Sequence, residues 1–222
     1  VMADLDNLIM PGVTQVQHPM HFGWFPSNAS LASVLGDIAS SGMGTLGISW
    51  ESCPALTEVE EVVCDWMRQL TGLSEQWEGT IHDTASTACL TALLVARERA
   101  SNYSQARDGL QGEAMPLVVY ASAQAHSSVN KAALLAGFGK NNVRVVAHNP
   151  NTFAMNADAL RAAMQADRDN NRIPAAVVAS SGSTGVVSFD PVDAIVEVAS
   201  EFGAWVHVDA AMAGTAMLLP EC

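Results

Sequence analysis

From Leu117 onward, short apolar runs alternate with segments whose apolar residues recur every three or four positions. The short runs are rich in Val and Ala and indicate buried strands, whereas the periodic segments indicate helices. Strands that alternate with helices form parallel sheets covered on both faces, so the sequence predicts an α/β fold with a mostly parallel sheet. The predicted strands are Leu117–Ala121, Val143–Ala147, Ala175–Ala179 and Trp205–Val208, and the predicted helices are Ser127–Ala136, Asn156–Asp167 and Pro191–Phe202.

Local signals mark the ends of two of these helices. Asn156 is a suitable N-cap, and Pro191 suits the first helical position. Before Leu117 the pattern predicts helices at Thr57–Leu70 and Thr84–Ala100, then a loop around Asp108–Glu113.

Residues 1–50 differ from residues 51–222 because Pro and Gly interrupt them repeatedly. Between these interruptions, Asn28–Ser41 has apolar residues at helical spacing and is a candidate helix. Such a segment has too little apolar surface to form its own core. We therefore expect residues 1–50 to pack against another surface.

Composition narrows the class of protein. Of 222 residues, 49% are hydrophobic, which indicates a globular core, and no apolar run approaches the length of a membrane span. The first ten residues are acidic, unlike a secretory leader. The formal charge of −13 argues against a surface for nucleic acid or anionic membrane. The four cysteines are widely spaced, which is typical of reduced thiols in a cytoplasmic protein.

Polar residues follow three of the predicted strands, at the edge where parallel sheets bind ligands. They are Ser122–Ser127, Ser180–Thr184 and Asp209. Asp209 ends an apolar strand, and a carboxylate there must be protonated, paired or facing a cation. The small residues after it leave room for a flat group, and a protonated ring nitrogen of a cofactor fits both features. The alternative is a strand-end Asp that caps a turn.

Two further motifs have a chemical and a structural interpretation. His126 follows a strand and can stack its imidazole on an aromatic ring, or it can simply precede a helix that Ser127 caps. Thr84, Ala85 and Ser86 open a helix, where free N–H groups and hydroxyls can bind a phosphate or serve only as a cap. Asp83 would repel a phosphate, so we expect it to face away or to cap the helix. His18-x-x-His21 has metal-ligand spacing, but Pro19 lies inside it and no third ligand is near, so no metal site is predicted.

The motifs become specific when they are taken together, in this order along the chain. They are Met10-Pro11-Gly12-Val13-Thr14, Phe25-Pro26, Ser49-Trp50, Pro54-x-x-Thr57-Glu58, Gln124-Ala125-His126-Ser127-Ser128, His207-Val208-Asp209-Ala210-Ala211-Met212-Ala213-Gly214 and Pro220-Glu221. This set resembles the group II pyridoxal-5′-phosphate-dependent decarboxylases, the family of aromatic-L-amino-acid, tyrosine and histidine decarboxylases. The resemblance implies the fold type I, aspartate-aminotransferase-like architecture. It also implies a homodimer with active sites at the subunit interface.

The resemblance also implies roles for individual residues toward pyridoxal 5′-phosphate. Asp209 is expected to pair with the ring nitrogen and His126 to stack on the ring, and these two are the catalytic candidates. The other expected cofactor contacts are Thr84, Ala85 and Ser86 at the phosphate, and Ser180 and Ala211 beside the ring. The expected substrate contacts are Trp24, Phe25, Pro26 and Ser27.

One feature of the family is absent from the sequence. The family's cofactor lysine follows the Pro-Glu motif in an Asn-Pro-His-Lys-Trp-like segment, and the chain ends just after Pro220-Glu221. The two lysines present, Lys131 and Lys140, lie in other contexts. We therefore expect a fragment, or one of two pieces. Residues 1–50 would be an N-terminal dimerisation and substrate-pocket segment. Residues 51–222 would form most of the large domain, truncated before the lysine and the C-terminal small domain.

The expected activity is decarboxylation of an aromatic L-amino acid to its amine and CO2, with the missing C-terminal part required. An aromatic aldehyde synthase of the same family is an alternative, because the catalytic loop that distinguishes the two activities lies outside the sequence. A non-catalytic interaction fragment is a second alternative. The expected partners are an amino-acid substrate and a second subunit, or a chain carrying the C-terminal part, and neither nucleic acid nor a membrane.

Overall fold

The computed structural model describes residues 1–25, 29–110 and 115–221. The chain divides into two compact units, Val1–Val59 and Glu60–Cys222. The second unit contains every buried residue among those described, so it holds the hydrophobic core.

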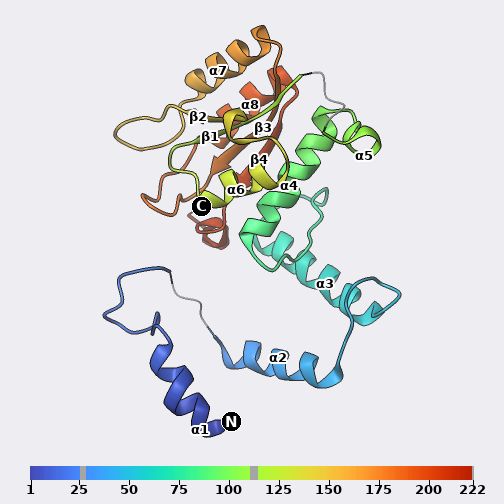
Figure 1. Ribbon diagram of the computed structural model, residues 1–222, viewed down its shortest axis with the longest axis vertical. Helices are drawn as coiled ribbons and strands as arrows, with labels where there is room; N and C mark the ends of the chain where they lie inside the picture. Colours follow the sequence, from blue (N-terminus) through green and yellow to red (C-terminus); the bar gives the residue numbers. More distant parts are fainter. Residues whose placement is uncertain (26–28, 111–114, 222) are drawn as a thin grey trace. The chain divides into compact units, whose positions relative to one another are not determined.

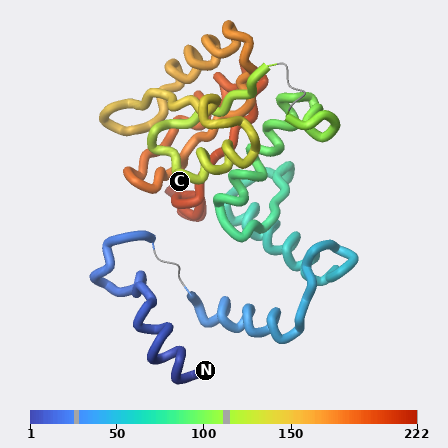
Figure 2. Tube along the Cα trace, in the orientation of Figure 1, coloured from blue at the N-terminus to red at the C-terminus, as the bar shows by residue number. Residues whose placement is uncertain are grey.

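The second unit is built on a four-stranded sheet in the order β2-β1-β3-β4, with every neighbouring pair parallel (Figure 1). After Leu117 the chain passes from a strand to a helix and on to the next strand three times. Figure 2 traces the path of the chain through these elements. The α/β prediction is therefore confirmed. The strands are β1 (Leu117–Ser122), β2 (Val143–Val146), β3 (Ile173–Ser180) and β4 (Trp205–Asp209).

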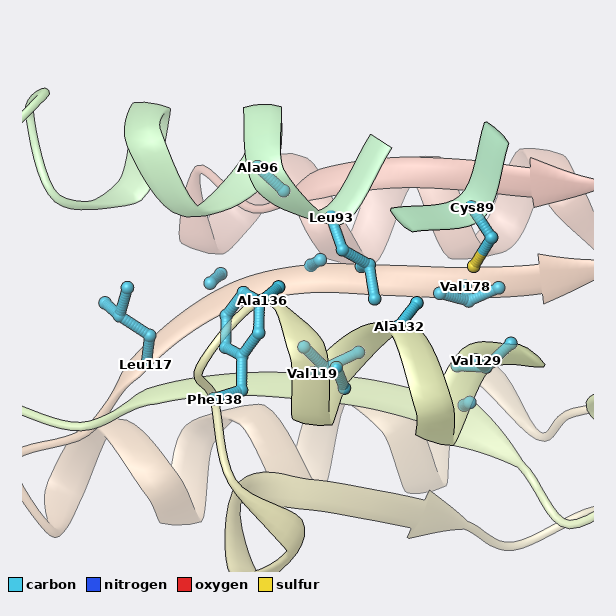
Figure 3. Packing of buried hydrophobic residues seen from close by; sticks show 14 residues of the cluster. Cys89, Leu93, Ala96, Leu117, Val119, Val129, Ala132, Ala136, Phe138 and Val178 are labelled. Carbon is cyan, nitrogen blue, oxygen red and sulfur yellow. The ribbon is translucent and has the colours of Figure 1, made fainter. Parts of the chain in front are cut away.

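Helices cover both faces of this sheet. Successive strand residues point to opposite sides, and in β1 and β3 both sets are mostly apolar and buried. On one face, α4 (Ala85–Ala100) and α6 (Ser127–Leu135) pack against Val119 and Val178, as Figure 3 shows. On the other face, α7 (Ala157–Asp169) and α8 (Val192–Phe202) enclose a second cluster. The members that β1 and β3 contribute to this second cluster are Val118, Tyr120, Val177 and Ala179.

Most of the predicted elements are present, and no predicted end is shifted by more than three residues. Asn156 caps α7 as predicted, since its side chain accepts the N–H of Ala159 at 2.9 Å. Pro191 is the N-cap of α8 and not its first helical residue, which corrects the sequence prediction. The sequence pattern also missed α5 (Gln105–Asp108), a helix of only four residues. Of the loop predicted at Asp108–Glu113, residues 111–113 lie outside the described part of the chain.

The first unit is helical and has no buried residue in its described part. α1 (Met2–Asp4) continues into a π-helical turn, Leu5–Ile9, and a 3₁₀ turn, Met10–Gly12. α2 (Leu31–Met43) begins after a capping box in which Ser30 and Ser33 exchange hydrogen bonds, later than the predicted start at Asn28. It ends at Gly44, whose φ of 60° suits glycine. α3 (Pro54–Leu70) continues across the division between the units.

Among the described residues, no helix is both long enough and apolar enough to cross a membrane.

Candidate active site

The carboxyl ends of the strands bring the predicted polar residues to one edge of the sheet. Because all four strands are parallel, Ser122, Ser180 and Asp209 end β1, β3 and β4 at the same edge. Ser180 and Asp209 are direct register partners, and Val178 pairs with His207 two residues before them. Val178 faces α4 and α6, so the alternation of side chains puts Ser180 and Asp209 on that same face.

The N-terminus of α4 lies at this edge as well. In Figure 3, Cys89 in the early part of α4 lies beside Val178 near the arrowheads, whereas Ala96 lies farther back along the strands. Burial, with a smaller contribution from the nearby charge of Asp209, raises the pKa of the Cys89 thiol to about 11. The start of α4 is therefore close to the carboxylate that ends β4.

Free N–H groups are present at that helix start. Thr84 is the N-cap, and its hydroxyl accepts the N–H of Thr87 at 3.2 Å. The N–H groups of Ala85 and Ser86 belong to the first turn and have no carbonyl four residues back within the helix. Both residues are exposed. An exposed first turn with unpaired N–H groups and the positive end of the helix dipole suits a phosphate.

Asp83 lies just before this helix but does not cap it. Its carboxylate accepts the N–H of Thr84 at 2.9 Å. A hydrogen bond from the Thr87 side chain is the main cause that holds the pKa of Asp83 below its usual value. Of the two roles expected from the sequence, capping is therefore wrong, because Thr84 is the N-cap.

Asp209 is half-buried and incompletely paired. One carboxylate oxygen, Oδ1, accepts the N–H of Ala211 at 3.2 Å. Within the described ranges, no lysine, arginine or histidine lies at ion-pair distance from this carboxylate. His207 precedes it on the same face of β4, but burial lowers the pKa of that imidazole, so the neutral form is favoured. The described residues therefore supply no cationic partner for this carboxylate.

Small residues let the loops that follow β3 and β4 pack closely beside Asp209. Gly182 has a φ of 77°, and a Cβ there would lie only 2.5 Å from the Cβ of Ala213. A Cβ on Gly214 would lie 3.2 Å from the Cβ of Ala210. The loops after β3 and β4 therefore approach each other closely. An exposed residue without a long side chain, Ala211, follows the carboxylate.

His126 is the N-cap of α6, at the end of the loop that leaves β1. Its Nδ1 accepts the N–H of Ser128 at 3.2 Å and lies 2.9 Å from the Ser128 hydroxyl. These contacts hold the ring through one nitrogen, and the residue is exposed. His126 itself caps the helix, so the alternative in which Ser127 does so is wrong.

Ser180 is buried, and its backbone is held by a residue that sequence reasoning missed. The N–H of Ser180 donates to Oδ2 of Asp190 at 2.7 Å. The other oxygen of Asp190, Oδ1, accepts the N–H of Met155 at 2.7 Å. The sequence offers one signal for this role, an Asp placed directly before Pro191 at the start of a predicted helix.

The predicted substrate residues are in the first unit. Trp24 and Phe25 are exposed to 72% and 66%. Pro26 and Ser27 lie outside the described residues. The proposed role of these four residues, to line a substrate pocket, stays a prediction.

The fold brings a helix N-terminus, which suits an anion, and a carboxylate, which suits a cation, to one edge of a parallel sheet. Comparison with protein-family models matches residues 1–222 to the pyridoxal-dependent decarboxylase conserved domain. The chain therefore belongs to this family, and the expected fold type I class is confirmed.

Individual relatives agree with this assignment. The chain is 40% identical over 233 residues to aromatic-L-amino-acid decarboxylase of Bos taurus, and 38% identical over 228 residues to phenylacetaldehyde synthase of Arabidopsis thaliana. Both alignments cover 100% of the chain, and 47% and 46% of the relatives. The structure of Oryza sativa TDC with PLP and tryptamine has a TM-score of 0.92 and 39% identity over 99% of the chain and 46% of its own. The chain thus spans less than half the length of these relatives.

Proposed function

We propose that this chain forms the cofactor-binding part of a pyridoxal-5′-phosphate-dependent decarboxylase that converts an aromatic L-amino acid to its amine and CO2. The observation that carries the proposal is the incompletely paired carboxylate of Asp209 at the same sheet edge as the free N–H groups of α4. The names of the relatives, which include aromatic-L-amino-acid and tyrosine decarboxylases, support the substrate class.

The charges at this edge of the sheet suit the cofactor, because the positive end of α4 suits its phosphate and Asp209 suits its ring nitrogen. When bound, pyridoxal 5′-phosphate supplies a protonated ring that accepts the electrons left at the α-carbon as CO2 departs. Ala85 and Ser86 bind the phosphate through their N–H groups, and Thr84 and Ser86 through their hydroxyls. Asp209 holds the proton on the ring nitrogen, and His126 stacks on the ring face.

Two more residues complete the proposed site. Ser180 supplies a hydroxyl on the same face as Asp209. Ala211 leaves room for the ring because its side chain is a single methyl group. Residues 1–50 supply the substrate pocket and dimer contacts, with Trp24, Phe25, Pro26 and Ser27 nearest the substrate, and residues 51–222 form most of the large domain. A cytoplasmic location is part of the proposal, supported by the free thiols of Cys53, Cys64 and Cys89.

Neither lysine of the chain is placed to hold the cofactor covalently. Lys140 lies in a 3₁₀ turn that enters β2, at the edge opposite Asp209. Lys131 is exposed on α6, whereas the buried face of that helix carries Val129, Ala132 and Ala133. The lysine that the reaction needs must then come from outside these 222 residues.

Borohydride reduction of the chain with pyridoxal 5′-phosphate, followed by peptide mapping, is therefore expected to label neither Lys131 nor Lys140 stoichiometrically. Both side chains are free to react slowly as surface amines, so labelling is compared with the same mixture reduced after denaturation. Selective labelling of either lysine in the folded chain would contradict the assignment.

Activity tests the proposal as a whole. The chain is combined with the C-terminal half of a relative, such as Bos taurus aromatic-L-amino-acid decarboxylase, and offered a panel of aromatic L-amino acids. Release of CO2 with formation of the amine is expected. Formation of the aldehyde would instead support the aldehyde synthase alternative. Failure to bind pyridoxal 5′-phosphate at all would leave the non-catalytic alternative in its place.

The first unit is proposed to pair with a second copy of the chain. The apolar face of α2 carries Leu31, Val34, Leu35 and Ile38, which are exposed to between 44% and 76% in the single chain. An exposed apolar face of this kind marks an interaction surface.

Replacing Leu35 by Glu is expected to weaken dimerisation by about tenfold or more, because a charge would be buried at the contact. Ser40→Glu is the matched control, since Ser40 lies on the opposite side of α2. Sedimentation equilibrium of the two variants measures the effect. A dimer constant that Leu35→Glu leaves unchanged would contradict this interface.

A further inference from the structure

Asp190 carries a buried carboxylate that the proposed chemistry does not use. The residue is 5% exposed, and within the described ranges no cationic side chain forms an ion pair with it. Burying a charge without such a partner is costly unless hydrogen bonds compensate. Here two backbone N–H groups donate hydrogen bonds to the carboxylate, and the residues that carry them show which segments Asp190 fixes.

The two carboxylate oxygens hold two separate segments. Oδ2 accepts the N–H of Ser180, the last residue of β3, and Oδ1 accepts the N–H of Met155, both at 2.7 Å. The N–H of Asp190 returns a hydrogen bond to the carbonyl of Ser180 at 2.9 Å. The last register pair between β1 and β3 is Ala121–Val178. Beyond the end of this pairing, the Asp190 carboxylate accepts the backbone N–H of Ser180 in place of a β1 carbonyl.

The two hydrogen bonds of the Asp190 carboxylate, here called the Asp190 tie, connect segments on either side of β1, the strand that leads to His126. Met155 follows β2, Ser180 ends β3, and β1 lies between these strands in the sheet. Met155 is itself 2% exposed and packs in the cluster under α7 and α8. The end of β3 is therefore anchored to the core on one face of the sheet, while the side chain of Ser180 points to the face of Asp209.

The loop between Ser180 and Asp190 also has internal hydrogen bonds that do not involve the Asp190 carboxylate. The N–H of Ser183 donates to the carbonyl of Ser188 at 3.0 Å, and their hydroxyls lie 2.8 Å apart. These contacts already close the segment between β3 and α8. The Asp190 carboxylate thus adds a further contact, to the backbone N–H of Ser180, a residue proposed to contact the cofactor.

We propose that Asp190 is a positioning residue that fixes the end of β3, so that Ser180 presents its hydroxyl to pyridoxal 5′-phosphate beside Asp209. This inference rests on the proposed function. It requires two acceptor oxygens, which an asparagine cannot supply, because its amide nitrogen is a donor and would face one of the two N–H groups.

The test compares two buried carboxylates at opposite edges of the sheet. Asp190→Asn is expected to weaken binding of pyridoxal 5′-phosphate by roughly tenfold, the effect of losing one well-placed hydrogen bond. Asp167→Asn is the matched control: Asp167 is 7% exposed but bonds Arg144 near the start of β2. Titrations of the chain with pyridoxal 5′-phosphate, at a temperature where both variants are folded, measure the affinities.

A double-mutant cycle separates positioning from general loosening. If Asp190 acts through Ser180, Asp190→Asn has little further effect on affinity in a Ser180→Ala background. Equal losses from the two Asp→Asn variants, or full additivity with Ser180→Ala, would overturn the inference.

Amide hydrogen exchange gives a readout that needs no cofactor. In Asp190→Asn, the amide of Ser180 or Met155 is expected to lose protection selectively, while amides in the middle of β3 keep theirs. If the unchanged chain fails to bind pyridoxal 5′-phosphate, the proposed function fails. The inference then also loses its cofactor role, and exchange shows whether the tie exists. Unchanged protection of both amides would overturn the inference by itself.

Discussion

Replacement of Asp209 by Asn is expected to slow decarboxylation by two or more powers of ten, or about 2.7 kcal/mol, with pyridoxal 5′-phosphate still bound. The side chain keeps its shape, and the N–H of Ala211 can still find an oxygen acceptor. The charge is lost, however, and with it the attraction that keeps a proton on the ring nitrogen. Without that proton the ring is a poor acceptor for the electrons released as CO2 departs.

The measurement is kcat in the assay that supplies the C-terminal half, together with a separate titration of cofactor binding. Asp193→Asn is the control, because Asp193 is an exposed carboxylate in the first turn of α8. Asp209→Glu is expected to be poor as well, since the longer side chain would push into the space for the ring. Near-normal turnover by Asp209→Asn with cofactor bound would show that the assigned role is wrong.

Much of the second unit could be predicted from the sequence because its strands are short, apolar and punctuated. Ala175–Ala179 lies within an eight-residue strand whose last seven residues are all buried, and such a run has one good solution, the centre of a parallel sheet. The shared edge followed from topology alone, since parallel strands end together. The strand end and the small residues after it therefore predict the position of Asp209 at this edge, which the structure shows, while its role toward the cofactor stays a prediction.

Other features depend on contacts that no local pattern encodes. Asp190 acts on Met155, 35 residues away, and on Ser180, 10 residues away, so its role appears only once the sheet is assembled. α5 is too short to show a helical period. Pro191 can occupy either of two neighbouring positions at a helix start, and local preference does not distinguish them.

For the first unit, the sequence predicts a helix but not the surface against which it packs. Apolar spacing predicted α2 correctly in kind, but nothing in the segment indicates what its apolar face contacts. That information belongs to a partner surface. The exposed Leu31 and Ile38 have the same sequence signature as residues buried in a core. Periodicity therefore predicts an apolar face but not its occupant.

The edge of the sheet opposite the site is held by a second buried carboxylate, and the largest loss of stability is expected there. Asp167 accepts the hydroxyl of Tyr120 at 2.9 Å and two guanidinium N–H groups of Arg144, at 2.9 and 2.6 Å. Burial and the bond to Asp167 raise the pKa of Tyr120, so the phenol stays neutral and donates. The hydrogen bond with Asp167 likewise raises the pKa of Arg144.

Asp167→Ala is expected to lower the free energy of unfolding by about 3 kcal/mol, the usual cost when one partner of a buried ion pair is removed. Tyr120→Phe should cost only about 1 kcal/mol, because it removes one hydrogen bond and leaves Asp167 paired with Arg144. Asp169→Ala is the control, since Asp169 is exposed two residues away in α7. Urea unfolding followed by circular dichroism gives the three values. A cost for Asp167→Ala no greater than that of Asp169→Ala would mean that Tyr120 and Arg144 are satisfied without it, and that α7 is held to the sheet by apolar packing alone.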